Sequence, residues 1–348
     1  MRIGITTGDI NGIGPEVILK ALSNNSALHD HSVVIYGSGK VMAYHKNIVK
    51  NIDVQFSNVS GAEHASNGRI SVVNCWTDDI QISLGKAEKV AGQFAHVALD
   101  RAVNDIKNGI IDVLVTAPIN KSTMDTMSFP YAGHTEYLTT SFGASSSLMT
   151  MVADDLRIAV VTNHEPISKV SSLFTRELLM RKINLFYHSL KIDFGRDKPT
   201  IAILGMNPHA GDGGKIGMEE EEIIKPVIED LKNKGVLTYG PYAADGFFGS
   251  GLFRKFDGIL AMYHDQGLIP FKTLSFGNGI NFTAGLPYVR TSPDHGTGYD
   301  IAGENKADEM SMRTAIFAAM DIFNNRENDK EMKANPLVKK AKFEKERY

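Results

Sequence analysis

Apolar and polar positions alternate along the chain in a way that predicts strands and helices in turn. Short runs rich in β-branched residues end in turn-forming residues, and stretches with helical spacing follow several of them. The predicted strands are Ile3–Thr7, Ser32–Tyr36, Ile111–Thr116, Ile158–Thr162, Ile201–Leu204 and Ile259–Tyr263. This alternation is typical of an α/β fold with a mostly parallel sheet flanked by helices.

Two longer stretches are predicted as helices. Gly85–Asn108 ends at a cap-forming Gly109, and it spaces its apolar residues for one core-facing side: Ala87, Val90, Ala91, Phe94, Val97, Ala98, Ala102 and Ile106. Met218–Lys234 opens with the acidic run Glu219–Glu222, which suits the positive end of a helix dipole and needs no catalytic role. The charged stretch from Asn324 to Tyr348 is expected to be a peripheral helix or tail.

Composition narrows the class of protein. The 37 basic and 40 acidic residues give a net charge of -3, so no global field favours nucleic acid or an anionic membrane. Cys75 is the single cysteine, and no apolar stretch reaches the ~20 residues that span a bilayer. No signal segment precedes the first strand, so we expect a soluble cytoplasmic protein of one or two lobes.

Three predicted strands end in polar segments that contain a histidine. His164, His209 and His264 follow the strands that begin at Ile158, Ile201 and Ile259. Ligands of open α/β sheets bind outside the carboxyl ends of the strands, so these imidazoles can converge. A single histidine is more often a hydrogen-bonded structural residue, but the repetition favours a divalent metal site, with zinc as the first candidate.

A second group of residues is cationic and polar, and it suits a phosphorylated ligand. Phosphate recognition needs short donors together with fixed cations. Lys272 and Arg290 stand in apolar runs, unlike ordinary surface cations. The group consists of Gly133, His134, Thr135, Glu136, Lys272, Asn281 and Arg290, with residues 291–297 directly after it.

The glycine-rich segments are weak evidence for a dinucleotide. Gly8–Glu16 follows the first strand and opens a helix, but it lacks the third glycine of G-x-G-x-x-G. Gly37–Gly39 is better explained as a tight turn. Gly211–Lys215 is equally compatible with a phosphate-binding loop and with a flexible loop.

The ordered motifs TTGDINGIGPE, VTAPINK, GHTEYLT, TNHEP, NPHAGDGG, YHDQGL and NFTAGLPYVRTSPDHGTGYD span nearly the whole chain. In this set the chain closely resembles the 4-hydroxythreonine-4-phosphate dehydrogenases of vitamin B6 biosynthesis. The resemblance implies the two-lobed fold of isocitrate and isopropylmalate dehydrogenases, which lacks the ordinary dinucleotide fingerprint. We expect residues 1–125 and 295–348 to form one lobe, and residues 126–294 to form a second lobe with the metal ligands and a dimer interface.

The resemblance also assigns roles to residues. It implies that His164, His209 and His264 bind the divalent metal, with the His264 ligand supplied by the partner subunit of a homodimer. The metal is expected to be Zn²⁺, or alternatively Mg²⁺ or Co²⁺. The residues that the resemblance implies in contact with the phosphorylated substrate are His134, Thr135, Lys272, Asn281 and Arg290. Asp245 is a candidate base, metal ligand or positioning carboxylate, with a helix cap or turn as the equal alternative.

The implied reaction is oxidation of 4-phosphooxy-L-threonine by NAD or NADP, followed by loss of carbon dioxide to give 3-amino-2-oxopropyl phosphate. Both steps build negative charge on one oxygen, which a divalent ion held by neutral imidazoles would stabilise. A dehydrogenase of threonate or erythronate 4-phosphate is the nearest alternative. A metal-dependent hydrolase and a non-catalytic phosphate-binding protein remain as the other two hypotheses.

One departure from the family pattern is visible near the start of the chain. The usual Asp-Pro-Ala-Gly is here Asp9-Ile10-Asn11-Gly12. Loss of the proline frees the backbone φ angle and restores a hydrogen-bond donor. We therefore expect a changed loop with activity retained.

Overall fold

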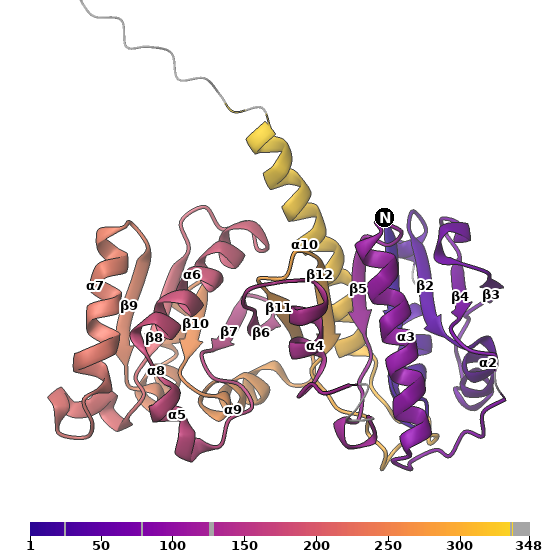
Figure 1. The fold of residues 1–348 in the computed structure, drawn as a ribbon, viewed down its shortest axis with the longest axis horizontal. Coiled ribbons are helices and arrows are strands. Elements are labelled where there is room, and N and C mark those ends of the chain that lie inside the picture. The colour runs from indigo at the N-terminus through magenta and orange to yellow at the C-terminus, as the bar shows by residue number, and fades with distance from the viewer. Residues whose placement is uncertain (24–25, 78, 125–128, 335, 337–348) are drawn as a thin grey trace, which may run out of the picture.

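A computed structural model describes residues 1–23, 26–77, 79–124, 129–334 and 336. Its strands form a single twelve-stranded sheet in the order β3-β4-β2-β1-β5-β12-β11-β6-β7-β10-β8-β9 (Figure 1). Neighbouring strands are parallel except where β11 and β6 meet their neighbours in the centre. The predicted α/β fold with a mostly parallel sheet is confirmed.

All six predicted strands are present, with ends that differ by up to a few residues. They are β1 (Arg2–Thr6), β2 (Ser32–Gly37), β5 (Val113–Thr116), β7 (Leu156–Val160), β8 (Thr200–Leu204) and β10 (Gly258–Ala261). Six further strands complete the sheet: β3 (Phe56–Val59), β4 (Ile70–Asn74), β6 (Leu148–Ala153), β9 (Leu237–Tyr242), β11 (Ile280–Ala284) and β12 (Val289–Pro293).

The α-helices of the described residues connect and cover these strands. They are α1 (Gly14–Leu22), α2 (Gly39–Ile48), α3 (Lys89–Lys107), α4 (His134–Ser141), α5 (Ile167–Leu173), α6 (Arg176–Ile192), α7 (Lys225–Asn233), α8 (Ala244–Gly249), α9 (His264–Ser275) and α10 (Met310–Ala334). Short helical turns lie at η1 (Ser26–Leu28), η2 (Ala62–His64), η3 (Lys121–Thr123), η4 (Pro208–Gly214), η5 (Glu220–Ile224) and η6 (Leu252–Lys255).

The two predicted helices are present but shorter. α3 begins at Lys89 and ends before Gly109, whose φ of +69° places it in the left-handed region that a helix cap needs. Val90 and Val97 were expected in the core, but they are 40% and 42% exposed because they lie on the outer side of α3. The second helix comprises a π-helical turn, η5, followed by α7.

The two faces of the sheet are covered differently. Val113 and Val115 of β5 pack into one hydrophobic core, whereas Leu114 points to the opposite face, as strand geometry requires. The first core is continuous: it joins α1, α2, α6, α7 and α10 to strands from both halves of the sheet. On the opposite face the cores are separate, one under α3 and α4 and the other under α8 and α9.

The long helix α10 joins the two halves. It packs against β12, β5 and β11 and also against α1 and α6, and Figure 1 shows it rising from the centre of the molecule. The predicted lobe boundaries at residues 125 and 295 stay a prediction, and residues 337–348 of the predicted tail lie outside the described residues. None of the helices in the described part of the chain is long and apolar enough to cross a membrane.

Candidate active site

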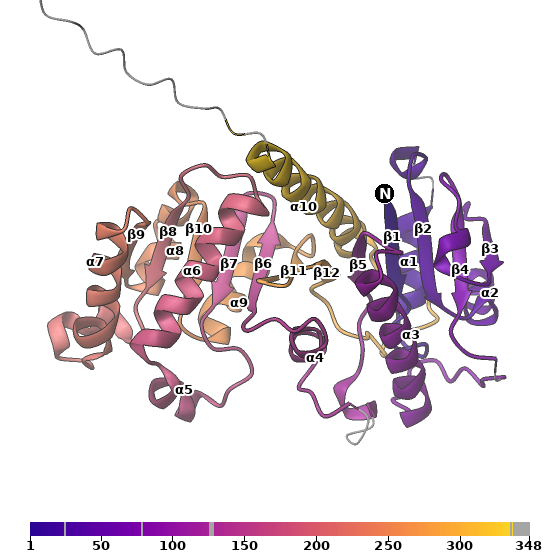
Figure 2. The ribbon, with the colours of Figure 1, turned by 45° about the horizontal axis from the view of Figure 1, so that its top comes forward.

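A small pocket opens on the face where the two cores are separate. Its volume is about 170 Å³. Figure 2 shows α4 lying between the two halves of the molecule, beside the centre of the sheet. The lining residues come from both halves: Thr116, Ala117, Pro118, Ile119, Lys121, Gly133, His134, Thr135, Glu136, Met149, His164, Asn281, Arg290, Ser292 and Pro293. Four of the five predicted substrate-binding residues and one predicted metal ligand therefore meet in one place.

Arg290 is the most unusual of these residues. It lies within β12 and is only 2% exposed, and its guanidinium donates to the hydroxyls of Thr116 (2.6 and 3.1 Å) and Thr283 (3.1 Å). Burial lowers its pKa to about 10, so it remains charged at neutral pH. No carboxylate of the described residues forms an ion pair with it. The charge of Glu136, which lines the same pocket, offsets only part of the effect of burial, so the buried cation favours an anionic ligand.

The first turn of α4 lies beside this guanidinium. Gly133, His134, Thr135 and Glu136 all line the pocket, so the amino end of the helix, which attracts anions, faces the same space. The His134 side chain is partly buried, and its buried Nε2 has no hydrogen-bond partner among the described residues. Burial, with the charges of Arg290 and Lys121, lowers the pKa of His134 well below its usual value. The neutral imidazole can therefore donate to a ligand without adding charge.

Lys121 and Glu136 complete the polar lining, and neither was among the predicted site residues. Lys121 Nζ lies 3.5 Å from His164 Nε2, and Glu136 Oε1 lies 3.7 Å from His164 Nδ1. The contact with His164 lowers the pKa of Glu136, although partial burial opposes this. The motif VTAPINK follows β5 and ends in Lys121. A cation just beyond a strand end was thus the signal available in the sequence.

The three predicted metal ligands are only partly brought together. His164 follows β7 and His264 begins α9 after the neighbouring strand β10, and their ring centroids are 5.9 Å apart. Both side chains are about two-fifths exposed, at 41% and 37%. His264 Nδ1 contacts Asp265 Oδ1 at 2.7 Å, which leaves Nε2 of His264 for a ligand. Within the part of the chain that the structure describes, no three His, Cys, Asp or Glu residues gather closely enough to hold a metal ion.

His209 lies in a left-handed turn. From His209 to Gly213 every residue has a positive φ, and three of them (His209, Ala210 and Asp212) are not glycine. Such backbone is strained and needs support. Glu220, fully buried, accepts from the Asn207 amide at 2.7 Å and from Asn207 Nδ2 at 2.9 Å. The acidic run thus anchors this turn, a structural role beyond the predicted complement to a helix dipole.

Lys272 and Asp245 lie outside the pocket in a single chain. Lys272 is on α9, where its Nζ donates to the backbone carbonyl of Asp294 at 3.4 Å. Asp245 is exposed on α8, beside a separate apolar hollow that also contains Ile269 and Asp265. Their predicted roles stay predictions.

The glycine-rich segment after β1 docks another loop of the chain. The Ile13 amide at the start of α1 donates to the carbonyl of Thr297 at 2.9 Å, and a Cβ at Gly12 would lie only 2.6 Å from that oxygen. The buried carboxylate of Asp9 accepts from Tyr299 Oη at 2.6 Å. Protein groups therefore occupy the amino end of α1, where a dinucleotide phosphate would bind in a Rossmann domain.

Ile10 and Asn11, which replace the usual Pro-Ala of the family pattern, make specific contacts. Ile10 is fully buried, and Asn11 Oδ1 accepts from the Ser83 amide at 2.9 Å while its Nδ2 donates to Lys86 O at 3.1 Å. His45 Nε2 bonds to the carbonyl of Ile10 at 2.9 Å. The changed residues therefore tie the loop after β1 to residues 83–86 and to α2.

The buried His45 predicts an acid-sensitive fold. Burial lowers its pKa from 6.5 to about 4, so the unfolded chain binds a proton more readily than the folded one. The contribution of His45 to the free energy of unfolding is then fully present above pH 6.5. This free energy falls by about 3 kcal/mol as the pH drops to 4. Urea unfolding of His45→Gln should show a shallower pH dependence than wild type across this window. His64→Gln, at an exposed histidine, is the control. A pH-independent difference between wild type and His45→Gln would contradict the prediction.

Comparison with solved structures first gives the class. Isocitrate dehydrogenase from Methylococcus capsulatus superposes with a TM-score of 0.51 over 96% of this chain and 88% of that chain. At 13% identity this is a likeness of fold alone, and the chain is an α/β protein of that architecture.

The sequence then gives the family. The profile of the pyridoxal phosphate biosynthetic protein PdxA matches residues 29–319, and the chain belongs to this family. A 4-hydroxythreonine-4-phosphate dehydrogenase from Bacteroides thetaiotaomicron is 52% identical over 97% of this chain and 93% of its own length. The crystal structure of the enzyme of that name from Klebsiella pneumoniae is 32% identical, with a TM-score of 0.80 over 92% of this chain and 98% of that chain. A Cutibacterium acnes protein, provisionally named a D-threonate 4-phosphate dehydrogenase, is 34% identical over 92% of this chain and 93% of its own length. The predicted family resemblance is confirmed.

Proposed function

We propose that this protein is a dehydrogenase that oxidises 4-phosphooxy-L-threonine with NAD and releases carbon dioxide, giving 3-amino-2-oxopropyl phosphate for pyridoxal 5′-phosphate biosynthesis. The observation that supports it most directly is the buried Arg290 guanidinium, which faces a small pocket and has no ion-pair partner among the described residues. The names of the relatives in the PdxA family support the same substrate. We place the enzyme in the cytoplasm.

The pocket residues can bind each polar part of this substrate. Arg290 and the amino end of α4, with His134 and Thr135, hold the phosphate. Lys121 lies at the edge nearest His164 and offsets the remaining negative charge of the substrate. Asn281 Oδ1 is buried without a partner in the described part of the chain, and it accepts from a substrate hydroxyl or ammonium group.

The donor set fits a divalent metal. His164 and His264 offer imidazole nitrogens from adjacent strand ends, and we propose His209 as the third ligand. Zn²⁺ is the first candidate, with Mg²⁺ or Co²⁺ as alternatives. When bound, the ion stabilises negative charge on the substrate oxygen, and NAD or NADP accepts the hydride. Because one chain does not bring three ligands together, we propose a homodimer in which His264 completes the partner's site.

A second substrate class is favoured by one relative. The Cutibacterium acnes protein is named for D-threonate 4-phosphate, which shares the phosphate, carboxylate and hydroxyl groups. Erythronate 4-phosphate belongs to the same class. The contacts to Arg290 and α4 would be common to all these substrates.

A coupled assay tests the proposed function. Reduced nicotinamide is followed by absorbance with 4-phosphooxy-L-threonine, threonate 4-phosphate and erythronate 4-phosphate, each with and without a chelator. We expect the highest kcat/KM with 4-phosphooxy-L-threonine and loss of turnover with chelator. Highest turnover of a sugar-acid phosphate would favour the second class. Release of phosphate without NAD would indicate a hydrolase, and binding without any turnover would indicate a phosphate-binding protein.

Lys121→Met tests the cation that the sequence-based prediction missed. A charged hydrogen bond contributes about 1.5–3 kcal/mol, so we expect kcat/KM to fall roughly 10- to 100-fold, mainly through KM. Lys50→Met, at an exposed lysine far along the chain, is the matched control. An unchanged KM in Lys121→Met would show that this lysine does not contact the substrate.

A further inference from the structure

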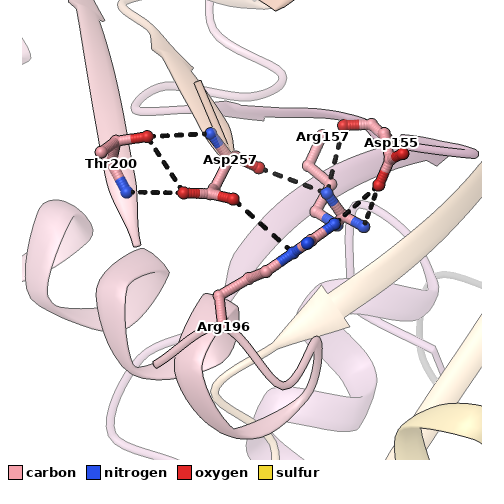
Figure 3. Close-up of polar contacts among 5 residues, drawn as sticks. All are labelled: Asp155, Arg157, Arg196, Thr200 and Asp257. Carbon is pink, nitrogen blue, oxygen red and sulfur yellow. Dashed lines mark hydrogen bonds and ion pairs between the residues drawn. The ribbon is translucent and has the colours of Figure 1, made fainter. Parts of the chain in front are cut away.

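A second cavity lies at the opposite ends of the strands that lead to the candidate active site. It has a volume of about 510 Å³ and is formed where β7, β8 and β10 begin. Four cationic side chains line it, Arg157, Arg196, Arg254 and Lys255, against two carboxylates, Asp155 and Asp257. Figure 3 shows the polar contacts that surround part of this cavity.

One part of the cluster is structural. Asp257 Oδ2 accepts from the amide and the hydroxyl of Thr200 at 2.9 and 3.0 Å, which joins the starts of β8 and β10 (Figure 3). Asp155 Oδ1 accepts from Arg196 at 2.6 Å and from Arg157 at 3.4 Å. Both carboxylates of the cavity lining are therefore engaged in these contacts. The described lining residues include no further carboxylate that could pair with Arg254 or Lys255.

Arg157 is the most buried cation of this network. The side chain of Arg157 is only 8% exposed, and its guanidinium lies 4.8 Å from the Phe194 ring. Its Nε is buried and has no hydrogen-bond partner among the described residues, whereas Arg196 Nε lies 3.6 Å from Asp257 Oδ1. The charge of Arg157 is therefore held in the cavity wall with incomplete compensation, which favours an anion in the cavity.

The remaining cations lie on the cavity rim. Arg254 and Lys255 belong to η6 and are exposed, and among the described residues neither forms an ion pair. The cavity therefore has two more cationic than anionic side chains, although the whole chain has a net charge of -3. In a protein with a net negative charge, an anion is attracted to a local cluster of positive charge and not to the rest of the surface.

We propose that this cavity is a second anion site, which binds a small phosphate-bearing molecule away from the active site. An excess of two positive charges matches a phosphate dianion, and arginine forks match its oxygens. The volume lies within the range of small-molecule sites, and Phe253 and Phe256 add an apolar wall for the rest of the molecule. The site shares no residue with the active-site pocket.

Phosphate titration in a variant without the active-site guanidinium tests this site alone. Isothermal titration calorimetry of Arg290→Met with inorganic phosphate should show one binding event per chain. Adding Arg254→Ala and Lys255→Ala should weaken that binding by about tenfold or more. Adding Lys89→Ala and Lys107→Ala instead removes the same charge from exposed positions on α3 and should change the affinity by less than about twofold.

The outcomes separate this site from the proposed function. Arg254→Ala/Lys255→Ala in the wild-type background should keep the wild-type kcat and KM, because neither residue contacts the active-site pocket. Absence of phosphate binding to Arg290→Met, or equal affinity in the two charge-removal variants, would overturn the second site. Either result would leave the dehydrogenase assay unaffected.

Discussion

Arg290→Met is expected to lower kcat/KM by about three orders of magnitude while leaving the empty protein at least as stable. Removing one partner of a buried, hydrogen-bonded charge pair costs about 2–5 kcal/mol, and each 1.36 kcal/mol is a factor of ten in rate. Among the described residues, the hydroxyls of Thr116 and Thr283 are the hydrogen-bond acceptors of this guanidinium. Its replacement by an apolar side chain then relieves an uncompensated buried charge.

Steady-state kinetics and urea unfolding together check this prediction. Arg290→Lys keeps the charge but loses the fork, so it should recover only part of the activity. Lys107→Met removes an exposed cation on α3, outside the pocket, and is the comparison for charge alone. A variant Arg290→Met that is strongly destabilised but has a normal KM would mean that Arg290 serves the fold and not the substrate.

Periodicity predicted the strands that lead to the site but not the strands that form its floor. The predicted strands are buried on both faces and contain runs of Val, Ile and Leu, so they are evident from the sequence. β11 instead alternates apolar and polar residues, and β12 has three polar residues in succession after Val289. Ile280 and Phe282 point to the continuous core, whereas Asn281 points to the opposite face.

The polar residues within β11 and β12 were the available sequence signal for the pocket. Val289 packs in the continuous core, and the next residue, Arg290, points to the cleft face. Polar residues on one side of a buried strand indicate that this face of the sheet contacts water or a ligand. The sequence alone could not show that the face of β11 and β12 meets α4 and Lys121, because that depends on the packing of two separate cores.

The prediction of three converging histidines depended on the positions of strand ends. Two of the three histidines lie close together in the structure. Adjacent parallel strands β7 and β10 place His164 and His264 side by side. β8 is next to β10 in the sheet, but the left-handed turn after it determines where His209 lies. A run of positive φ angles that includes non-glycine residues has no reliable sequence pattern, so the position of His209 could not be predicted in this way.

Mixing two inactive variants is expected to restore activity if the metal site is shared between subunits. His164→Ala and His264→Ala should each lose bound metal and turnover as homodimers. In a twofold-symmetric dimer with one copy of each variant, one site loses both histidines and the other keeps both. Random exchange makes about half of the dimers mixed, so about a quarter of the wild-type activity and metal content should return.

The distance between the two rings makes this test decisive. At 5.9 Å between centroids, His164 and His264 of one chain are near enough to serve one site without a partner. In that case every mixed dimer has one damaged ligand in each site, and mixing restores neither metal nor turnover. Metal content by atomic absorption and NAD reduction by absorbance should rise together after subunit exchange. His188→Ala, at a histidine on α6 outside the pocket, supplies the exchange control. When it is mixed with His164→Ala or His264→Ala, the activity should equal the average of the activities of the two proteins mixed.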